Sequence, residues 1–268
     1  MTHRSFPLRS STTLALAGLA LLATGCQTSH AACCAPIAST ANGRDLLPDH
    51  AAVTAALRKV VAETNGGFGL PMWAAIVDRD GVVALVARSG QDRGDQWPGS
   101  RVIAAQKANT ANAFSLPGLS LSTANLYAAT QPGGSLFGLQ FSNPVDTGVA
   151  YGGDGALFGT AHDPMVGHRI GGVNVFGGGL GLYAAGGKLV GALGLSGDSS
   201  VADHVIAWKL RKQPGLDHVP NGVSPTKDDN MVVDFADGKS ASGWGHPETT
   251  PAASEIVRKL PTTHPIAK

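Results

Sequence analysis

A glycine-rich stretch at residues 171–211 constrains the fold more than any other part of the chain. Three apolar segments, at residues 173–176, 180–184 and 188–195, are separated by links of adjacent glycines. The second link, Gly186-Gly187, supplies the positive φ values that a tight hairpin turn needs. The stretch therefore predicts three consecutive strands, of which the last two form a hairpin.

A helix is expected directly after this hairpin. Ser199 or Ser200 can cap its first turn, and apolar side chains then recur at the spacing of one helix face as far as Trp208. The free N–H groups at the N-terminus of such a helix suit an anionic group beside Ser196 and Gly197. A core hairpin followed by a capped helix, with no ligand, fits the same pattern.

Earlier segments supply the remaining elements of the fold. Helical spacing predicts a helix at residues 48–63, and an alanine-rich composition indicates a second at 100–114. A cap at Ser120 or Ser122 would start a short third helix that reaches Ala129. Two apolar runs around an Asp-Gly turn predict strands at residues 72–77 and 82–86. Strands joined by tight turns pair antiparallel, and helices cover the sheet they form. The predicted fold class is therefore α+β, a single antiparallel sheet with helices packed on it.

The length and composition favour one domain. A chain of 268 residues that is 43% hydrophobic can bury one sizeable core. The net charge is +1 with no basic run, so nothing indicates a nucleic-acid surface. We expect the domain at residues 47–220, including a long loop at 132–172 that is either functional or an insertion. Residues 221–268 are expected to form an extended tail, with a possible edge strand at 231–235.

The N-terminus has the pattern of an export signal. Two arginines precede an apolar segment at residues 14–23, which is too short to span a membrane. Ala23-Thr24-Gly25-Cys26 resembles a bacterial lipobox, although leucine is usual at the position of Ala23, so cleavage by the ordinary signal peptidase stays open. We expect residues 1–25 to be a signal peptide of the lipoprotein type, Cys26 to be lipidated, and residues 26–46 to be a flexible tether.

Export would place the mature protein in the periplasm or on the outer membrane, or make it secreted. A lipid on Cys26 would be its only attachment to a membrane.

No complete catalytic or metal motif is present. Two residues after Ser196 stands Asp198, where the G-x-S-x-G elbow of a serine hydrolase needs its last glycine. The sequence has no P-loop and no zinc-ligand spacing. Lys107 stands on a helix of small residues, where a lysine either extends to solvent or contacts an anion. His204 could cap, titrate, ligate a metal or haem iron, or be a hydrogen-bonded core residue. His168 is a loop histidine that either faces solvent or binds a metal.

Several motifs together resemble one family. They are the segment at residues 69–81, Gln106-Lys107-Ala108, the turn at residues 176–179, and the run VGALGLSGD at residues 190–198. In this order, over about residues 52–211, they resemble the GlcG/HbpS-like family of haem-binding proteins. The C-terminal domain of PduO-type cobalamin adenosyltransferases is similar.

The resemblance implies an α+β domain that assembles into dimers or larger rings and binds haem. Some members are linked to haem degradation, iron binding or redox sensing, so whether this chain is an enzyme stays open and no catalytic residue is assigned. The residues that the resemblance and the chemistry together suggest for cofactor binding are Lys107, Thr110, Phe114, Ser120, Ser196, Gly197 and His204. The candidate metal ligands are His204 and His168.

Two other functions compete with haem binding. The glycine-rich turn before the last helix could bind, or act on, another small anionic metabolite. The protein could also be a structural or sensor subunit whose partner is another protein.

Overall fold

The computed structural model describes residues 42–261 and residue 263. These residues belong to one compact unit, Ala38–Lys268. The predicted signal peptide, Cys26 and most of the predicted tether lie outside the described residues. Within the described residues, no helix has the length and apolarity that a membrane span requires.

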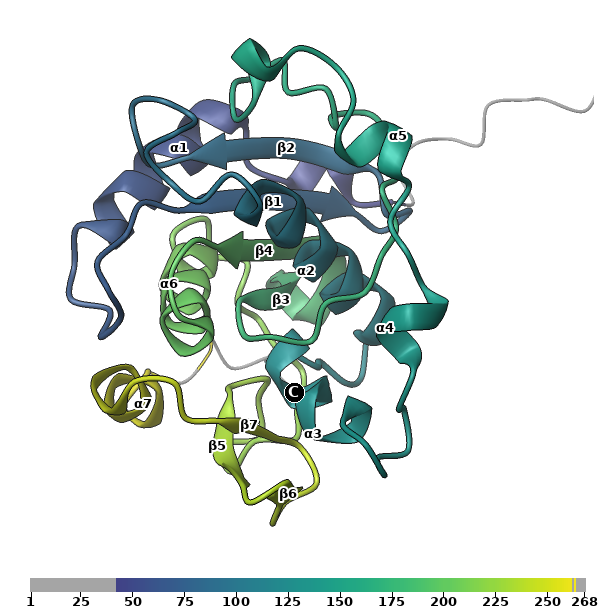
Figure 1. Ribbon diagram of the computed structural model, residues 1–268, viewed down its shortest axis with the longest axis vertical. Coiled ribbons are helices and arrows are strands. Elements are labelled where there is room, and N and C mark those ends of the chain that lie inside the picture. The colour runs from purple at the N-terminus through teal and green to yellow at the C-terminus, as the bar shows by residue number, and fades with distance from the viewer. Residues whose placement is uncertain (1–41, 262, 264–268) are drawn as a thin grey trace, which may run out of the picture. The chain divides into compact units, whose positions relative to one another are not determined.

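A four-stranded antiparallel sheet forms the centre of the unit (Figure 1). Its order is β2-β1-β4-β3, with β1 at Trp73–Asp78, β2 at Val83–Arg88, β3 at Gly179–Ala184 and β4 at Lys188–Ser196. All six residues of β1 are buried, as expected for a strand between two neighbours and two helical layers. Both predicted hairpins are confirmed, and Gly186 adopts a φ of 75° in the turn between β3 and β4.

The predicted strand at residues 173–176 is wrong. This segment is extended and largely buried, but it pairs with no strand. Side chains take up its backbone groups instead: Thr110 Oγ1 accepts from the Asn174 amide, and Thr123 Oγ1 donates to the Phe176 carbonyl. Side-chain hydrogen bonds of this kind compete with the pairing of a strand ladder.

Three long helices cover the two faces of the sheet. The helix α2, Ser100–Phe114, packs on one face, and α1, His50–Val61, packs with α6, Ser200–Lys212, on the other (Figure 1). All three are confirmed predictions, and Ser199 caps α6 as expected. The close approach of α2 requires Gly194 of β4, because a Cβ there would lie 1.9 Å from the Ala104 carbonyl oxygen.

Short helical turns occupy the links between these elements. The predicted helix at residues 120–129 is a 3-10 turn, η4 (Thr123–Leu126), followed by one turn of α3 (Tyr127–Thr130). The other short helices are η3 (Arg44–Leu46), α4 (Leu139–Ser142), α5 (Thr147–Ala150), η5 (Gly155–Leu157) and η6 (Ala185–Gly187). Three of them lie in the predicted long loop, whose Met165 and Ile170 are buried against the α2 face of the sheet.

The C-terminal segment is folded, so the expected extended tail at residues 221–268 is wrong. The segment also adds strands beyond the single sheet that was expected. A second sheet of order β6-β5-β7 is formed by β5 (Val232–Ala236), β6 (Lys239–Ser240) and β7 (Gly245–Pro247), and the helix α7 (Pro251–Arg258) follows it. The predicted α+β class, an antiparallel sheet with helices packed on it, is confirmed, and this second, small sheet is an addition to it. Within the second sheet β5 pairs in parallel with β7. The helix α7 lies beside α6 (Figure 1). Its buried Val257 belongs to one apolar cluster with Val201 and Val205 of α6, and this packing orders the segment.

Candidate functional site

Lys107 is buried and holds an ion pair within the core. Its Nζ lies 2.7 Å from Asp203 Oδ2 and donates to the Leu195 carbonyl at 2.9 Å. Burial raises the pKa of Asp203 to about 6, although the neighbouring ammonium opposes this shift. Lys107 therefore does not extend to solvent, and the anion that it contacts is a carboxylate of α6.

The turn at Ser196 and Gly197 is also filled by the protein's own groups. Ser196 is buried, and a Cβ at Gly197 would lie 2.6 Å from a backbone oxygen. The amide of Asp198 donates to Asp203 Oδ1 at 2.9 Å, and the Asp198 carboxylate accepts from the amide of Phe68 at 2.8 Å. An external anion at the N-terminus of α6 would therefore meet two carboxylates.

Ser120 and His204 belong to a second buried network, which ties the C-terminal segment to the main sheet. Ser120 Oγ donates to Asp229 Oδ2 at 2.7 Å, and Arg211 binds both oxygens of that carboxylate at 2.7 and 2.8 Å. His204 Nε2 lies 3.1 Å from the amide nitrogen of Met231, while Nδ1 has no hydrogen-bond partner within the described part of the chain. Burial lowers the pKa of His204 to about 3, so the ring is neutral at pH 7.

The other three predicted residues are dispersed. Thr110 is buried and donates to the Gln106 carbonyl at 2.8 Å. Phe114 packs partly buried beside Leu121, and His168 is exposed. In the described ranges no group of three or more acidic, histidine or cysteine side chains could hold a metal ion. None of the eight predicted residues lines the pocket that follows.

A pocket of about 310 Å³ lies at the start of α2. We name it the arginine–aromatic pocket. It is lined by Trp73, Asp92, Arg93, Gly94, Pro98, Arg101, Val102, Tyr151 and Phe158. Its walls come from three places: the first residue of β1, the segment from the β2–α2 link into the first turn of α2, and the predicted long loop.

Arg101 fastens that loop to α2. Its guanidinium stacks over the Phe158 ring at 3.7 Å and donates to the Ala150 carbonyl at 3.0 Å. It also forms a two-point ion pair with Asp163, in which Nε lies 2.8 Å from Oδ2. A buried bidentate pair of this kind fixes geometry. The aromatic wall of the pocket is therefore held by α2 itself.

Two other arginines, Arg93 in the lining and Arg88 near it, have fewer polar partners than Arg101. The side chain of Arg93 is 53% exposed, and its Nη1 lies 3.9 Å from the carboxylate of Asp92. Arg88, beside Trp73 at the end of β2, has buried Nε and Nη1 atoms with no hydrogen-bond partner among the described residues. Apolar walls with the half-exposed guanidinium of Arg93 among them suit a flat apolar ligand that carries an anionic group.

This pocket was not predicted from the sequence. The one signal that touched it was the length of the 132–172 loop, which indicated either a functional segment or an insertion. The residues themselves gave no pattern, because Arg101 and Asp163 are 62 positions apart and no short motif links them.

The fold is an α+β domain with a preformed pocket at the start of α2. The HbpS-like family, described as haem degrading proteins, matches residues 49–211, and the chain belongs to that family. The resemblance found in the sequence is thereby confirmed, and haem, the expected cofactor, is the molecule in the family's description.

Two solved structures are similar to about three fifths of this chain. A crystal structure of a PduOC:heme complex is 25% identical, over 62% of this chain and 92% of that chain, with a TM-score of 0.42. The Klebsiella pneumoniae protein ORFY is 24% identical, over 61% of this chain and 88% of that chain, with a TM-score of 0.41. No curated protein matches the chain.

Proposed function

We propose that this protein binds haem in the arginine–aromatic pocket. The observation that carries the proposal is membership of the HbpS-like family over residues 49–211, a range that includes every residue lining the pocket. The apolar cavity between α1 and α6 is smaller, at about 190 Å³, and offers no uncommitted cation.

The residues present fit the chemistry of haem. A haem site needs apolar walls, an iron ligand and partners for two propionates. Trp73 and Phe158 supply walls, and Tyr151 is the lining side chain with an iron-ligating atom. Arg93, a half-exposed residue of the lining, supplies charge for a propionate. When bound, haem would supply a redox-active iron.

The size of the pocket implies partial exposure of the ligand. Ligand sites usually measure about 300–1,000 Å³, and this one is at the lower limit. We expect a haem to lie with part of its macrocycle outside. Lys107, Ser120 and His204 are at most 1% exposed, so haem would reach them only if their buried networks opened.

A haemin titration followed by absorbance tests the proposal. We expect saturable binding in the micromolar range. Arg93→Gln should weaken binding about 5- to 30-fold, the effect of losing a charged hydrogen bond of about 1–2 kcal/mol. Tyr151→Phe keeps the ring but should shift the Soret band. Arg258→Gln, an exposed change outside the family-matched region, is the matched control.

The titration can contradict either the haem function or only the assignment of haem to this pocket. Absence of saturable haemin binding would remove the proposed function. Binding that is unchanged in both pocket variants would keep the function and move the site, and His204→Ala would then be the next variant. Loss of the Soret band on adding ascorbate in air would indicate that bound haem is degraded.

The competing function at the turn before α6 has less support. A small anionic metabolite there would be repelled by the Asp198 carboxylate, and the amides of Phe68 and Asp198 are already bound by Asp198 and Asp203. No observation favours it over haem.

Export and lipidation form a further part of the proposal. Their support is the sequence of residues 1–26 alone. Cell fractionation should find the protein with membranes, and Cys26→Ser should release it to a soluble fraction. An unprocessed protein in the cytosol would contradict export.

We also propose that the protein forms a homo-oligomer, as the family resemblance implies. Light scattering should give a mass of at least two chains. A monomer at all concentrations tested would contradict assembly.

A further inference from the structure

The side chains of the arginine–aromatic pocket that can donate to a metal do so through oxygen. Histidine, cysteine and methionine are missing from the described residues that line it, and tyrosine is present once, as Tyr151. The other metal-binding side chain of the lining is the carboxylate of Asp92. Both donors are hard oxygen atoms that carry a negative charge when they bind a metal.

The backbone around Tyr151 is held while its side chain is open. The amide nitrogen of Tyr151 lies 3.2 Å from the Thr147 carbonyl oxygen, at the end of α5. The carbonyl of the preceding residue, Ala150, accepts from the buried Arg101 at 3.0 Å. Tyr151 itself is 64% exposed. A ligand in the pocket can therefore reach the phenol oxygen without opening the core.

Other donors near the pocket are committed or lie outside it. Asp92 Oδ1 already accepts from the Gly94 amide at 2.8 Å, which ties this carboxylate to its own loop. His50 Nε2 lies 3.1 Å from the Gly159 carbonyl oxygen. His162 is exposed on the same loop as Gly159 but does not line the pocket. Tyr151 is thus the open donor of the lining.

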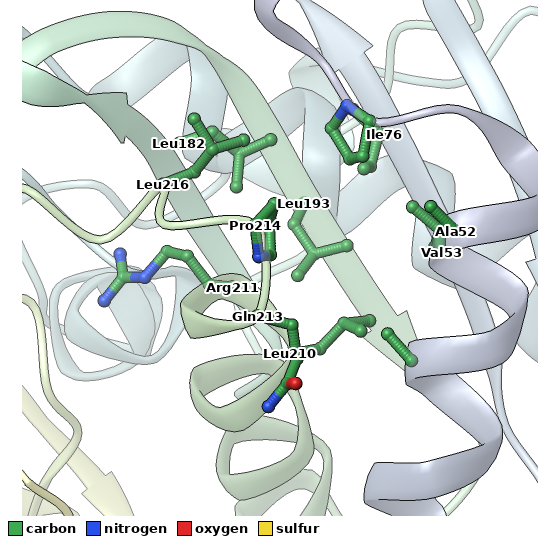
Figure 2. Close-up of a pocket in the computed structure, with 12 residues that line it drawn as sticks. Ala52, Val53, Ile76, Leu182, Leu193, Leu210, Arg211, Gln213, Pro214 and Leu216 are labelled. Atoms are coloured by element: carbon green, nitrogen blue, oxygen red, sulfur yellow. The ribbon is translucent and has the colours of Figure 1, made fainter.

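The apolar cavity between α1 and α6, of about 190 Å³, has no comparable donor. Its lining is aliphatic apart from Arg211 and Gln213, and Figure 2 shows the Arg211 guanidinium pointing away from it. Neither side chain is one that haem proteins use to hold iron. An iron-ligating oxygen is therefore a property of the arginine–aromatic pocket and not of cavities in this fold generally.

An anionic oxygen donor distinguishes the two oxidation states of iron. Coulomb attraction grows with the charge on the metal, so a phenolate gains more from Fe(III) than from Fe(II). Neutral imidazole and thioether ligands lack this extra term, and the identity of the axial ligand is one of the features by which a protein sets the reduction potential of haem.

We propose that Tyr151 makes the arginine–aromatic pocket selective for the oxidised, Fe(III) form of haem. This inference rests on the proposed function, because it assumes that haem occupies this pocket. An external one-electron reductant would then weaken binding: the electron goes to the iron, and the phenolate oxygen that leaves it takes a proton from water. The protein would hold haem in an oxidising medium and release it in a reducing one.

Two matched pairs of porphyrins test the selectivity by absorbance or fluorescence titration of the full chain. The first pair is haemin in air and haemin reduced with dithionite under argon. The second is Ga(III)- and Zn(II)-protoporphyrin, whose metals keep their charge. We expect the divalent member of each pair to bind at least about 10-fold more weakly. For haem this corresponds to a midpoint potential lowered on binding by at least about 59 mV. Equal affinities within both pairs would overturn this inference alone, whereas no binding of haemin would overturn the proposed function with it.

Variants assign the selectivity to Tyr151. Tyr151→Phe should bring the affinities within each pair to within about 2-fold of one another. Tyr151→His supplies a neutral donor and should make the affinity for reduced haem at least equal to that for haemin. His162→Gln, at an exposed position of the same loop, is the matched control and should keep the wild-type ratio. A ratio that is unchanged in Tyr151→Phe, or lost in His162→Gln, would refute the assignment.

Discussion

Removal of the Lys107 ammonium should leave Asp203 as an unpaired carboxylate in the core. Both residues are nearly inaccessible, at 1% and 2% exposure, and their charged atoms are 2.7 Å apart. Breaking a buried pair in this way typically costs about 3–5 kcal/mol. We therefore expect Lys107→Met to lose this amount of unfolding free energy at pH 7.5. For a domain of this size, this corresponds to a fall in Tm of about 6–20 °C.

The loss should depend on pH in a defined direction. Burial raises the pKa of Asp203 to about 6, above its usual value of 3.8, and removal of Lys107 raises it further. A carboxyl whose folded pKa is raised takes up a proton in the native state first, so its contribution to stability improves as the pH falls toward 3.8. At pH 5 the carboxyl is neutral in the variant, and the penalty should largely disappear.

Urea unfolding at pH 7.5 and pH 5 measures both effects. Lys59→Met, an exposed lysine on α1, is the control and should change stability by no more than about 0.5 kcal/mol. A second change, Asp203→Leu in the Lys107→Met background, should restore most of the stability because no unpaired charge remains. A loss below about 1 kcal/mol at pH 7.5, or an equal loss at both pH values, would refute the reasoning.

Two further predictions concern packing and acid stability. Gly194→Ala should destabilise the protein by at least about 1–3 kcal/mol in urea unfolding, because the added Cβ would lie 1.9 Å from a carbonyl oxygen of α2. Gly118→Ala meets no atom within 4 Å and should be nearly neutral. Burial lowers the pKa of His204 to about 3 and of His246 to about 4, so both histidines stay neutral in the native state as the unfolded chain becomes protonated. Because only the unfolded chain gains these protons, the free energy of unfolding falls as the pH drops from about 6.5 to 4. Each unit of pKa shift accounts for a loss of about 1.4 kcal/mol.

The two predictions have separate checks. If Gly194→Ala is as stable as Gly118→Ala, α2 does not depend on the glycine contact. His246→Gln should flatten the pH dependence of unfolding between pH 6.5 and 4, whereas His162→Gln, at an exposed loop position, should not. Equal slopes in the two variants would contradict the assignment to His246.

Much of the main sheet could be predicted from local patterns. The Asp-Gly and Gly-Gly turns fixed both hairpins, and the predicted bounds of α2, residues 100–114, agree with the structure. The segment at residues 173–176 failed because its apolar composition is equally suited to a buried link without a ladder. The C-terminal strands were largely missed because two of them have only two or three residues, too few for a periodic signal.

The site residues were harder to predict than the fold. Lys107, Ser120 and His204 are close to polar partners, as their chemistry suggested, but those partners are side-chain and backbone groups of the protein itself. The sequence could not reveal this, because whether a charge is free or paired depends on residues that are distant in the chain. Lys107 and Asp203 are 96 positions apart.

The sequence by itself determined the family and the order of the main elements, since turn glycines, caps and apolar spacing act over a few neighbouring residues. Only the tertiary structure decided where a ligand fits. The packing of the long loop onto α2 through Arg101 creates the arginine–aromatic pocket, and the alanines of α1 leave the cavity beside Leu210. Pockets are spaces between elements, so they depend on how distant side chains pack and not on any one segment.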